Sequence, residues 1–322
     1  MTTQLNMILN TFYSGPQAWF FLAADHGYFA EAGLDVTFTE GDTLANAVPK
    51  VASGAFDIGY GDMNALIELA GRDPARAPIA VFAMHNWSPY TIAVAADGPI
   101  ASPRDLQDQM LLSHANDASL RMFPEFARRA SLDRDRVRVQ IAQEHHRVLI
   151  AQVLSGESAA AGLFGFVNTL NSAALEAGID PARLRHFEWR KVVPELYGAA
   201  IIASHDLVHN NPRAVTGFVA AVNRGLKDAI ADPDVAIAAV ARRNSAINIA
   251  ANRARLVGTL AVEMSHPEQA SHGLGDIDNA RLSAAISLIC EVKQLPLRPA
   301  VSDVFDRSFL PPTESRIRTL AM

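Results

Sequence analysis

The sequence predicts a two-lobed α/β protein, and three features of the chain lead to that prediction. Strand-like and helix-like segments alternate from residue 4 to residue 203, a pattern typical of sheets with helices on both faces. The alternation runs in two series, and the second follows an apolar, β-branched segment at residues 90–95 and a turn at residues 97–99. The chain after residue 211 has helical patterning. With 322 residues, 49% of them apolar, the chain is long enough for two lobes with their own cores.

The first series predicts a mostly parallel sheet. Its strands are expected at residues 4–9, 35–38, 56–59 and 78–84, and its helices at residues 17–32, 44–53 and 64–71. The helix over residues 17–32 has an apolar face at helical spacing, which includes Trp19, Leu22 and Phe29. Gly33 follows this helix in the position of a left-handed C-cap.

The second series has its own strands and helices, after which the chain returns to the first lobe. Strands are expected at residues 90–95, 110–113, 137–141 and 159–164, and helices at residues 103–106, 119–130, 148–155 and 167–177. A returning strand is expected at residues 197–203, followed by helices at residues 212–231, 235–245, 250–264 and 278–291. We therefore expect the first lobe to comprise residues 1–92 and 200–322, and the second lobe residues 93–199.

Charge and cysteine content exclude several classes of protein. The net charge of −6 and the pI near 5.9 give no electrostatic footprint for nucleic acid. Cys290 is the only cysteine, so the sequence predicts no disulfide and no thiolate metal cluster. Neither a metal-binding motif nor a dinucleotide or phosphate loop is present, so we expect no metal and no cofactor. We expect a monomer.

The start of the sequence leaves the compartment open. Residues 1–6 lack the charged and apolar regions of a signal peptide. We expect a cell-envelope or periplasmic protein if a leader has been removed, and a cytoplasmic protein otherwise.

Four segments resemble one family of binding proteins. Residues 19–36, WFFLAADHGYFAEAGLDV, are similar to its opening signature, and residues 51–66, VASGAFDIGYGDMNAL, to the element that follows. Residues 100–106, IASPRDL, and residues 149–164, LIAQVLSGESAAAGLF, resemble its second-lobe segments. The family usually has Gly-Lys shortly after the Asp-Leu pair, where this chain has Asp108 and Gln109.

The family is the thiamine-pyrimidine-precursor and alkanesulfonate/taurine group of solute-binding proteins of ABC transporters. The resemblance extends from about residue 5 to residue 207 by motif. It implies a type II periplasmic-binding fold, a small-molecule ligand held between two lobes, and a membrane permease as partner. It does not define the ligand.

Ligand contacts are expected in the strand-to-helix loops, because the clefts of such sheets lie at the carboxyl ends of their strands. The candidate ligand-binding residues of the first lobe are Phe12, Tyr13, Ser14, Gln17, Asp62, Met63, Asn64, His85 and Trp87. Those of the second lobe are Asn116, Asp117, Ser119, Phe164, Asn168 and Glu188. Helix capping is the alternative role for Ser14, Asp62, Asp117 and Ser119, and packing is the alternative for Trp87 and Phe164.

The residue types in these loops favour one class of ligand. Residues 11–17, 61–64, 85–88 and 116–119 contain no Arg or Lys, whereas a sulfonate or carboxylate usually draws an arginine. Aromatic rings with Asp, Asn and Glu suit a flat heterocycle that carries hydrogen-bond donors. We therefore expect a thiamine-precursor-like aminopyrimidine, with alkanesulfonate or taurine-like anions as the alternative, since helix N-termini also bind anions.

An enzyme of the same fold is the other alternative. Fungal relatives make the thiamine pyrimidine from pyridoxal phosphate and a histidine of their own chain. They carry a lysine and, four residues later, that histidine in the loop after the third strand. The matching positions here are Gly61 and Ala65, and residues 56–84 contain neither lysine nor histidine. We therefore expect a binding protein and not an enzyme.

Overall fold

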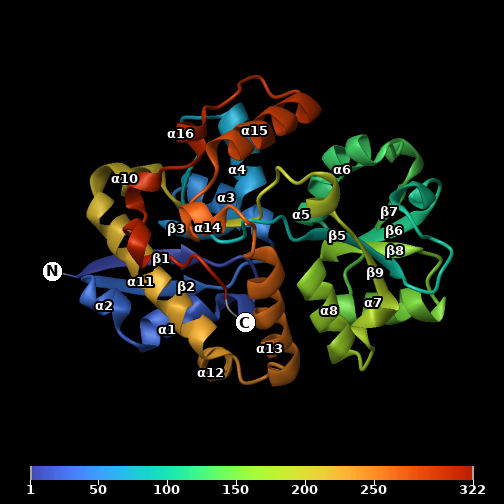
Figure 1. Cartoon of the computed structure of the whole chain (residues 1–322), viewed down its shortest axis with the longest axis horizontal. Coiled ribbons are helices and arrows are strands. Elements are labelled where there is room, and N and C mark those ends of the chain that lie inside the picture. The colour runs from blue at the N-terminus through green and yellow to red at the C-terminus, as the bar shows by residue number, and fades with distance from the viewer. Residues whose placement is uncertain (1, 321–322) are drawn as a thin grey trace. The chain divides into compact units, whose positions relative to one another are not determined.

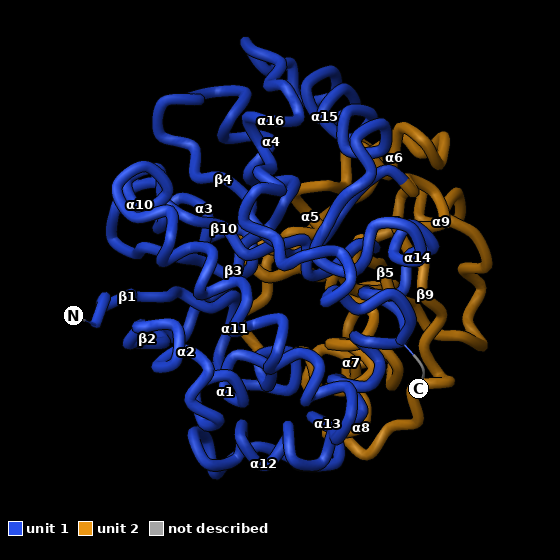
Figure 2. Tube along the Cα trace, turned by 60° about the vertical axis from the view of Figure 1, so that its left-hand side comes forward, with its two compact units in different colours: residues 1–87, 195–322 blue, residues 88–194 orange. Residues whose placement is uncertain are grey.

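The computed structural model describes residues 2–320, which form two compact units. Unit 1 consists of the chain up to Trp87 together with the chain from Glu195 onward, and unit 2 is the continuous segment Ser88–Pro194 (Figure 2). The chain thus leaves unit 1 once and returns to it once. Both crossover points lie about five residues before the lobe boundaries expected from the sequence.

Unit 1 contains a five-stranded mixed sheet in the order β2-β1-β3-β10-β4. Its strands are β1 (Thr3–Ile8), β2 (Leu34–Thr39), β3 (Ile58–Asp62), β4 (Ile79–Ala83) and β10 (Ala199–Ala203). Strand β1 pairs in parallel with β2 and β3, whereas β10 is antiparallel to both of its neighbours, β3 and β4. Strands β1, β3 and β4 therefore run in one direction, and their carboxyl ends lie along one edge.

The first helices of unit 1 are α1 (Ala18–Asp25), α2 (Tyr28–Glu31), α3 (Leu44–Ala52) and α4 (Met63–Arg72). The prediction of one helix over residues 17–32 is wrong, because Gly27 has φ of 76° and ends α1 before α2 begins. That left-handed conformation costs glycine little and interrupts the helical hydrogen bonds. Gly33 has φ of 72°, as the C-cap prediction requires.

Unit 2 contains a second five-stranded mixed sheet, in the order β7-β6-β8-β5-β9. Its strands are β5 (Tyr90–Ala95), β6 (Met110–Ser113), β7 (Arg138–Ile141), β8 (Gly162–Phe166) and β9 (Leu184–Glu188). Strand β9, absent from the sequence prediction, pairs antiparallel with β5. Its sequence, LRHFE, is short and half polar, so it lacks the apolar pattern of the other strands.

The helices of unit 2 are α5 (Ala118–Arg121), α6 (Phe123–Ala130), α7 (His146–Ser155), α8 (Val167–Glu176) and α9 (Trp189–Val192). A single helix was expected over residues 119–130, but the chain forms α5 and α6 in succession. Pro124 lies in the first turn of α6, where its missing N–H is tolerated, and it could not have donated a hydrogen bond within a continuous helix.

The helical C-terminal region belongs to unit 1 and is drawn in yellow to red in Figure 1. Its helices are α10 (His205–Asn210), α11 (Pro212–Ala231), α12 (Pro233–Arg243), α13 (Ile249–Gly258), α14 (Gln269–His272), α15 (Asn279–Lys293) and α16 (Val301–Val304), and a π-helical turn, Thr259–Glu263, extends α13. Helix α11 packs against α1. This part of the prediction is confirmed.

Short 3-10 helices complete the chain. They are η1 (Gly15–Gln17), η2 (Pro103–Leu106), η3 (Arg134–Arg136), η4 (Pro181–Arg183), η6 (Arg307–Phe309) and η7 (Thr313–Ser315). Within residues 2–320, none of the helices combines the length and the apolar content that crossing a bilayer requires. The two mixed sheets flanked by helices confirm the predicted α/β class.

Candidate functional site

The loops that follow β1, β3 and β4 lie at the carboxyl edge of the unit 1 sheet, where the sequence predicted ligand contacts. The loop after β1 carries Ser14 and Gln17, which are fully buried. The loop after β4 carries His85, which is also buried. These polar side chains are thus withdrawn from bulk water at the edge of the sheet.

A buried polar stripe on α13 and its π-helical extension meets these loops. Asn252, Arg255, Thr259 and Glu263 follow one another at spacings of three, four and four residues, which places them on one helical face. All four are buried, Arg255 with 8% of its surface exposed and Glu263 with 3%. Charged side chains this deep in a protein require specific partners. Single-turn π-helical insertions within helices are frequent at functional sites.

Arg255 and Asn252 bind the loop after β1. Arg255 donates through Nη1 to Ser14 Oγ at 3.0 Å, and Asn252 Oδ1 accepts from the backbone N–H of Gly15 at 3.0 Å. Gln17 Oε1 accepts from both the backbone and the hydroxyl of Ser14, each at 2.8 Å. Ser14 therefore closes a capping box and also joins the loop to the guanidinium of α13.

His85, Tyr60 and Glu263 form the second part of a buried polar cluster, whose first part is Ser14, Gln17, Asn252 and Arg255. The hydroxyl of Tyr60 lies 3.0 Å from His85 Nε2, and Glu263 Oε2 lies 3.8 Å from the same nitrogen. Burial and, to a lesser degree, the charge of Arg255 lower the pKa of His85 to about 3, so its ring is neutral at ordinary pH. Burial, reinforced by Glu263, raises the pKa of Tyr60, which stays protonated.

Two buried polar atoms in this region lack a hydrogen-bond partner among residues 2–320. They are His85 Nδ1 and Trp19 Nε1, and both side chains are at most 3% exposed. Both rings pack edge-on against Tyr60, with centroids 6.0 Å and 6.4 Å away. A buried polar group without a partner costs about 1–3 kcal/mol, so each atom is available to a bound molecule or to water.

The aromatic candidates of unit 1 differ in their surroundings. Phe12 is 54% exposed, whereas Tyr13 packs edge-on against Phe21 and donates from its hydroxyl to the carbonyl of Phe38 at 3.1 Å. Trp87 is half-buried, and its ring centroid lies 4.2 Å from that of His266. Phe12 and Trp87 therefore keep aromatic surface available for a ligand, and Tyr13 has a packing role.

Asp62, Met63 and Asn64 have structural contacts. Asp62 caps α4, its Oδ1 accepting from the backbone N–H of Asn64 at 2.7 Å. Asn64 Nδ2 donates to the carbonyl of Tyr197 at 2.6 Å, and Met63 is fully buried. These residues hold the start of α4 against the returning chain, which is the capping alternative considered from the sequence.

In unit 2, the turn before α5 resembles the one before α4. Asp117 caps α5 through the backbone N–H of Ser119 at 2.7 Å, and burial raises the pKa of its carboxyl against the effect of that bond. Ser119 Oγ donates to the carbonyl of Gly165 at 2.7 Å. Asn116 is exposed with φ of 63°, and Asn168 is buried at the start of α8.

The two remaining candidates of unit 2, Phe164 and Glu188, make close contacts with neighbouring side chains. Phe164 is 1% exposed and packs edge-on against Phe123 and Trp189, so the structure places it in the core. Glu188 forms ion pairs with Arg190 at 2.5 Å and with Lys191 at 2.6 Å. Burial opposes ionisation of Glu188, but the hydrogen bonds from these two cations outweigh it and lower its pKa.

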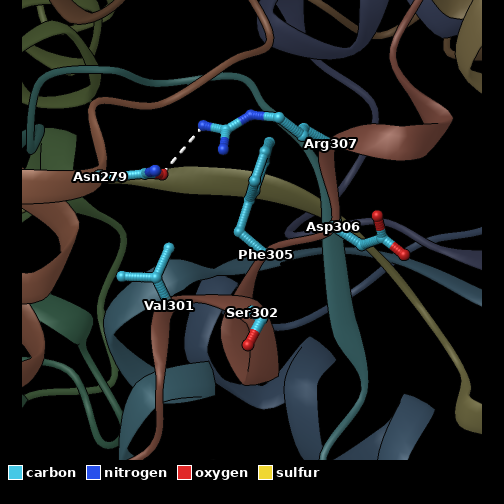
Figure 3. Close-up of a pocket in the computed structure, with 6 residues that line it drawn as sticks. All are labelled: Asn279, Val301, Ser302, Phe305, Asp306 and Arg307. Carbon is cyan, nitrogen blue, oxygen red and sulfur yellow. Dashed lines mark hydrogen bonds between the residues drawn. The ribbon is translucent and has the colours of Figure 1, made fainter.

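A surface pocket of about 520 Å³ lies elsewhere in unit 1 and is lined by Asn279, Val301, Ser302, Phe305, Asp306 and Arg307 (Figure 3). Phe305 pairs with Ala80 near the amino end of β4, away from the edge that carries His85. Arg307 in this pocket already donates to Asp276 and to Asn279. The pocket is therefore separate from the buried polar cluster.

The sequence prediction did not include Arg255, Asn252 or Glu263. It treated residues 250–264 as one more amphipathic helix of the C-terminal region. The available signal was the helical spacing of the polar residues at positions 252, 255, 259 and 263, which leaves Arg253 as the one polar residue of the segment outside the stripe. A helix with a polar stripe on a buried face indicates a site or a buried network.

The chain matches one known family over most of its length. The sequence matches the family described as NMT1/THI5 like over residues 17–236, more than half of its length. The chain belongs to the NMT1/THI5-like family. The resemblance inferred from the motifs is therefore confirmed at the level of the family. Among curated proteins, none matches the chain closely enough in sequence to support an inference.

Several solved structures that match this chain in fold are structures of periplasmic binding proteins. The periplasmic aliphatic sulphonate binding protein SsuA from Escherichia coli matches with a TM-score of 0.69 and 14% identity, covering 95% of this chain and 92% of that one. The alkanesulfonate-binding protein SsuA from Xanthomonas axonopodis pv. citri, bound to MOPS, matches with a TM-score of 0.67 and 13% identity, covering 94% and 98%. A putative SsuA from Methylobacillus flagellatus KT matches with a TM-score of 0.64 and 14% identity, covering 96% and 92%. These similarities show the periplasmic-binding fold.

Proposed function

We propose that this NMT1/THI5-like protein is the solute-binding component of an ABC-type importer in the cell envelope. The observation that carries the proposal is the buried Arg255, which α13 brings to Ser14 at the carboxyl edge of the unit 1 sheet. The family match and the fold of the SsuA proteins support the same function. A transporter permease is the partner that this function requires.

We propose a small organic anion, such as an alkanesulfonate, as the ligand. The sequence favoured an aminopyrimidine because the loops contain no Arg or Lys. Arg255, from another part of the chain, reaches the loop after β1 and supplies the cation that an anionic ligand requires. A guanidinium binds an oxyanion with two parallel hydrogen bonds, and this interaction is stronger where water is excluded. His85 Nδ1 and Trp19 Nε1 are further buried nitrogens whose rings both pack against Tyr60 and that have hydrogen-bond donor capacity for a ligand, His85 in the matching tautomer.

An aminopyrimidine is the second candidate ligand. Glu263 supports it, because a buried carboxylate accepts hydrogen bonds from an exocyclic amine, and the neutral His85 lies beside it. The partly exposed Phe12 and Trp87 could stack on a flat ring. The two candidates differ in which charge of the stripe the ligand uses: Arg255 for an anion, and Glu263 for a donor.

We propose that the protein binds its ligand without the chemistry of the fungal enzymes, and the positions that match those enzymes support this. Gly61 lies on β3, where an added Cβ would meet Ile202 Cδ1 at 2.8 Å and Val48 Cγ2 at 3.2 Å. A lysine at this position would thus point into the packed interior. Ala65 is buried in the first turn of α4 and offers no imidazole. These two positions support a binding protein over an enzyme that sacrifices a histidine.

Titration calorimetry with ethanesulfonate and with an aminopyrimidine tests the proposal. We expect ethanesulfonate to bind and Arg255→Met to weaken it by about tenfold to a thousandfold, as loss of a charged hydrogen-bonding partner does. Arg253→Met is the matched control, because Arg253 lies on the same helix but is 46% exposed and forms its ion pair with the exposed Asp234. If the aminopyrimidine binds instead and Glu263→Gln weakens it, the second candidate is correct. If neither probe binds the wild-type protein, the proposed ligand classes are wrong.

A further inference from the structure

The two segments that connect unit 1 to unit 2 are both bound by residues 263–281 of unit 1. The outgoing segment ends at Trp87, whose backbone N–H donates to the carbonyl of Glu263 at 2.9 Å. Its neighbour Asn86 accepts through Oδ1 from the backbone N–H of His266 at 3.1 Å. The end of the π-helical turn and the residues after it therefore fix the outgoing segment.

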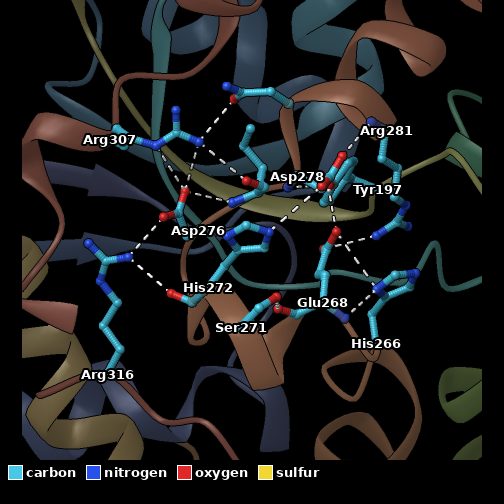
Figure 4. Close-up of polar contacts among 12 residues, drawn as sticks. Tyr197, His266, Glu268, Ser271, His272, Asp276, Asp278, Arg281, Arg307 and Arg316 are labelled. Atoms are coloured by element: carbon cyan, nitrogen blue, oxygen red, sulfur yellow. Dashed lines mark hydrogen bonds and ion pairs between the residues drawn. The ribbon is translucent and has the colours of Figure 1, made fainter. Parts of the chain in front are cut away.

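The returning segment is fixed by residues just beyond that turn. Tyr197 donates from its hydroxyl to Glu268 Oε2 at 3.0 Å and accepts from the backbone N–H of Asp278 at 3.1 Å. The carbonyl of Leu196 accepts from Arg281 Nη2 at 2.9 Å. Figure 4 shows Tyr197, Glu268, Arg281 and His266 converging on one another. The returning segment is thus bound through the backbone of Leu196 and through the side chain of Tyr197.

Arg281 is the residue common to both segments. Its guanidinium carbon lies 4.0 Å from the ring centroid of Tyr197 and 5.2 Å from that of Trp87. It also pairs with Glu268 at 2.9 Å, and the two side chains are only 11% and 6% exposed. A planar guanidinium can bind a carbonyl and a carboxylate in its plane while its faces contact aromatic rings. No other type of side chain could make all of these contacts at once.

We infer that Arg281 is a positioning residue that holds the Trp87 indole and both connecting segments in one arrangement, so that ligand affinity depends on it without direct contact. The inference rests on the proposed function, because Trp87 is a proposed ligand contact. His266 also packs edge-on against Trp87, with ring centroids 4.2 Å apart, and burial, with a smaller effect of Arg281, lowers its pKa to about 4. The neutral imidazole packs on the indole without adding a second positive charge beside Arg281.

The test compares two buried ion pairs of the same unit. Removing Arg281 alone would leave Glu268 buried without its cation, so the informative variant is Arg281→Met combined with Glu268→Gln. The matched control is Arg316→Met combined with Asp276→Asn, because Arg316 and Asp276 are 11% and 9% exposed and pair at 2.8 Å. Arg316 donates to the carbonyls of His272 and Pro311 and contacts neither connecting segment.

Amide hydrogen exchange without ligand is the first measurement. We expect the Arg281/Glu268 variant to exchange at least about tenfold faster in peptides that cover residues 84–88 and 195–199, and the control to leave these peptides unchanged. Faster exchange in only one of the two segments, or an equal effect in the control, would overturn the inference.

Ligand affinity is the second measurement, with ethanesulfonate and an aminopyrimidine as probes. We expect the Arg281/Glu268 variant to bind the preferred probe at least about tenfold more weakly than the control, and Arg281→Lys, which keeps the charge, to recover part of the loss. Equal affinity of the variant and the control would contradict the inference. If the wild-type protein binds neither probe, the proposed ligand classes fail, and the exchange measurement still decides whether Arg281 holds the two segments.

Discussion

Arg255 Nη1 donates to Ser14 Oγ at 3.0 Å, and this bond joins two residues that are 241 positions apart. It connects the first strand-to-helix loop of the chain with a helix of the C-terminal region. The adjacent bond from Gly15 to Asn252, 3.0 Å long, runs beside it. Both of these hydrogen bonds of the buried polar cluster can form only where α13 lies close against the loop after β1.

The first prediction concerns that close approach. A Cβ at Gly15 would collide with the backbone carbonyl of Asn252 and would lie 3.1 Å from the backbone nitrogen of Leu256. Gly15→Ala should therefore push α13 away, destabilise the protein by about 1–3 kcal/mol and lower affinity for ethanesulfonate by at least about tenfold. Gly217→Ala on α11 is the control, because its Cβ would lie 3.1 Å from the Ala32 methyl and at an ordinary contact distance of 3.7 Å from the Ala32 carbonyl oxygen and Leu34 Cδ1. Equal affinity in the two variants, measured by calorimetry, would show that the Ser14–Arg255 contact does not serve binding.

The second prediction concerns Trp87. If its half-buried indole contacts the ligand, Trp87→Ala should lose stacking worth about 0.5–1.5 kcal/mol in addition to apolar burial. The expected loss of affinity for an aromatic probe is about tenfold to several hundredfold.

Thermal melts without ligand distinguish this role from packing. Trp19→Ala serves as the reference for a core tryptophan, since Trp19 is fully buried and such truncations cost about 3–5 kcal/mol. A large drop in melting temperature for Trp87→Ala with unchanged affinity would assign Trp87 to packing.

The third prediction concerns pH. The pKa of His85 is lowered by burial from 6.5 to about 3, so the folded protein keeps this ring neutral while the unfolded chain protonates it near pH 6.5. Stability contributed by neutral His85 is therefore present above pH 6.5 and decreases as the pH falls toward 3. The slope is about 1.4 kcal/mol per pH unit for one such group.

Urea unfolding between pH 5 and 7 measures this slope in the wild-type protein and in His85→Asn. In the variant, the free energy of unfolding should depend less on pH, by about the contribution of one group. His186 and His266, whose pKa values burial lowers to about 4, should still contribute to the slope. Tyr60, Glu263 and Arg255 lie around His85, and burial raises the pKa of Tyr60, so this hydroxyl stays protonated throughout the range. Identical slopes would mean that His85 is charged in the folded state.

Local patterns in the sequence were sufficient to predict the fold class. The two βα series follow from alternating apolar segments, and α11 begins at Pro212 and ends at Ala231 as its periodicity indicated. Left-handed Gly33 was predicted from its position after a helix. Gly27 was not, because a glycine inside an amphipathic pattern is compatible with either a continuous or a broken helix.

The candidate site was only partly predictable, since its charged members come from distant parts of the chain. The loops after β1 and β4 could be identified because strand ends can be recognised locally. Arg255 and Glu263 could not be assigned to these loops, because nothing in residues 249–263 indicates which surface the helix covers. Without the contact between Arg255 and the loop after β1, the loops contained no cation, and their residue types favoured a neutral or cationic ligand.

The place of β10 in the unit 1 sheet has a consequence for synthesis on the ribosome. Strands β3 and β4 do not pair with each other; each pairs with β10, which lies between them. While residues 1–198 emerge, β4 has no partner in this sheet, and β3 pairs only with β1. Unit 2, by contrast, is one continuous segment and can fold as soon as Pro194 is clear of the ribosome. We therefore expect the inserted unit to become protease-resistant on nascent chains before the unit that begins the sequence.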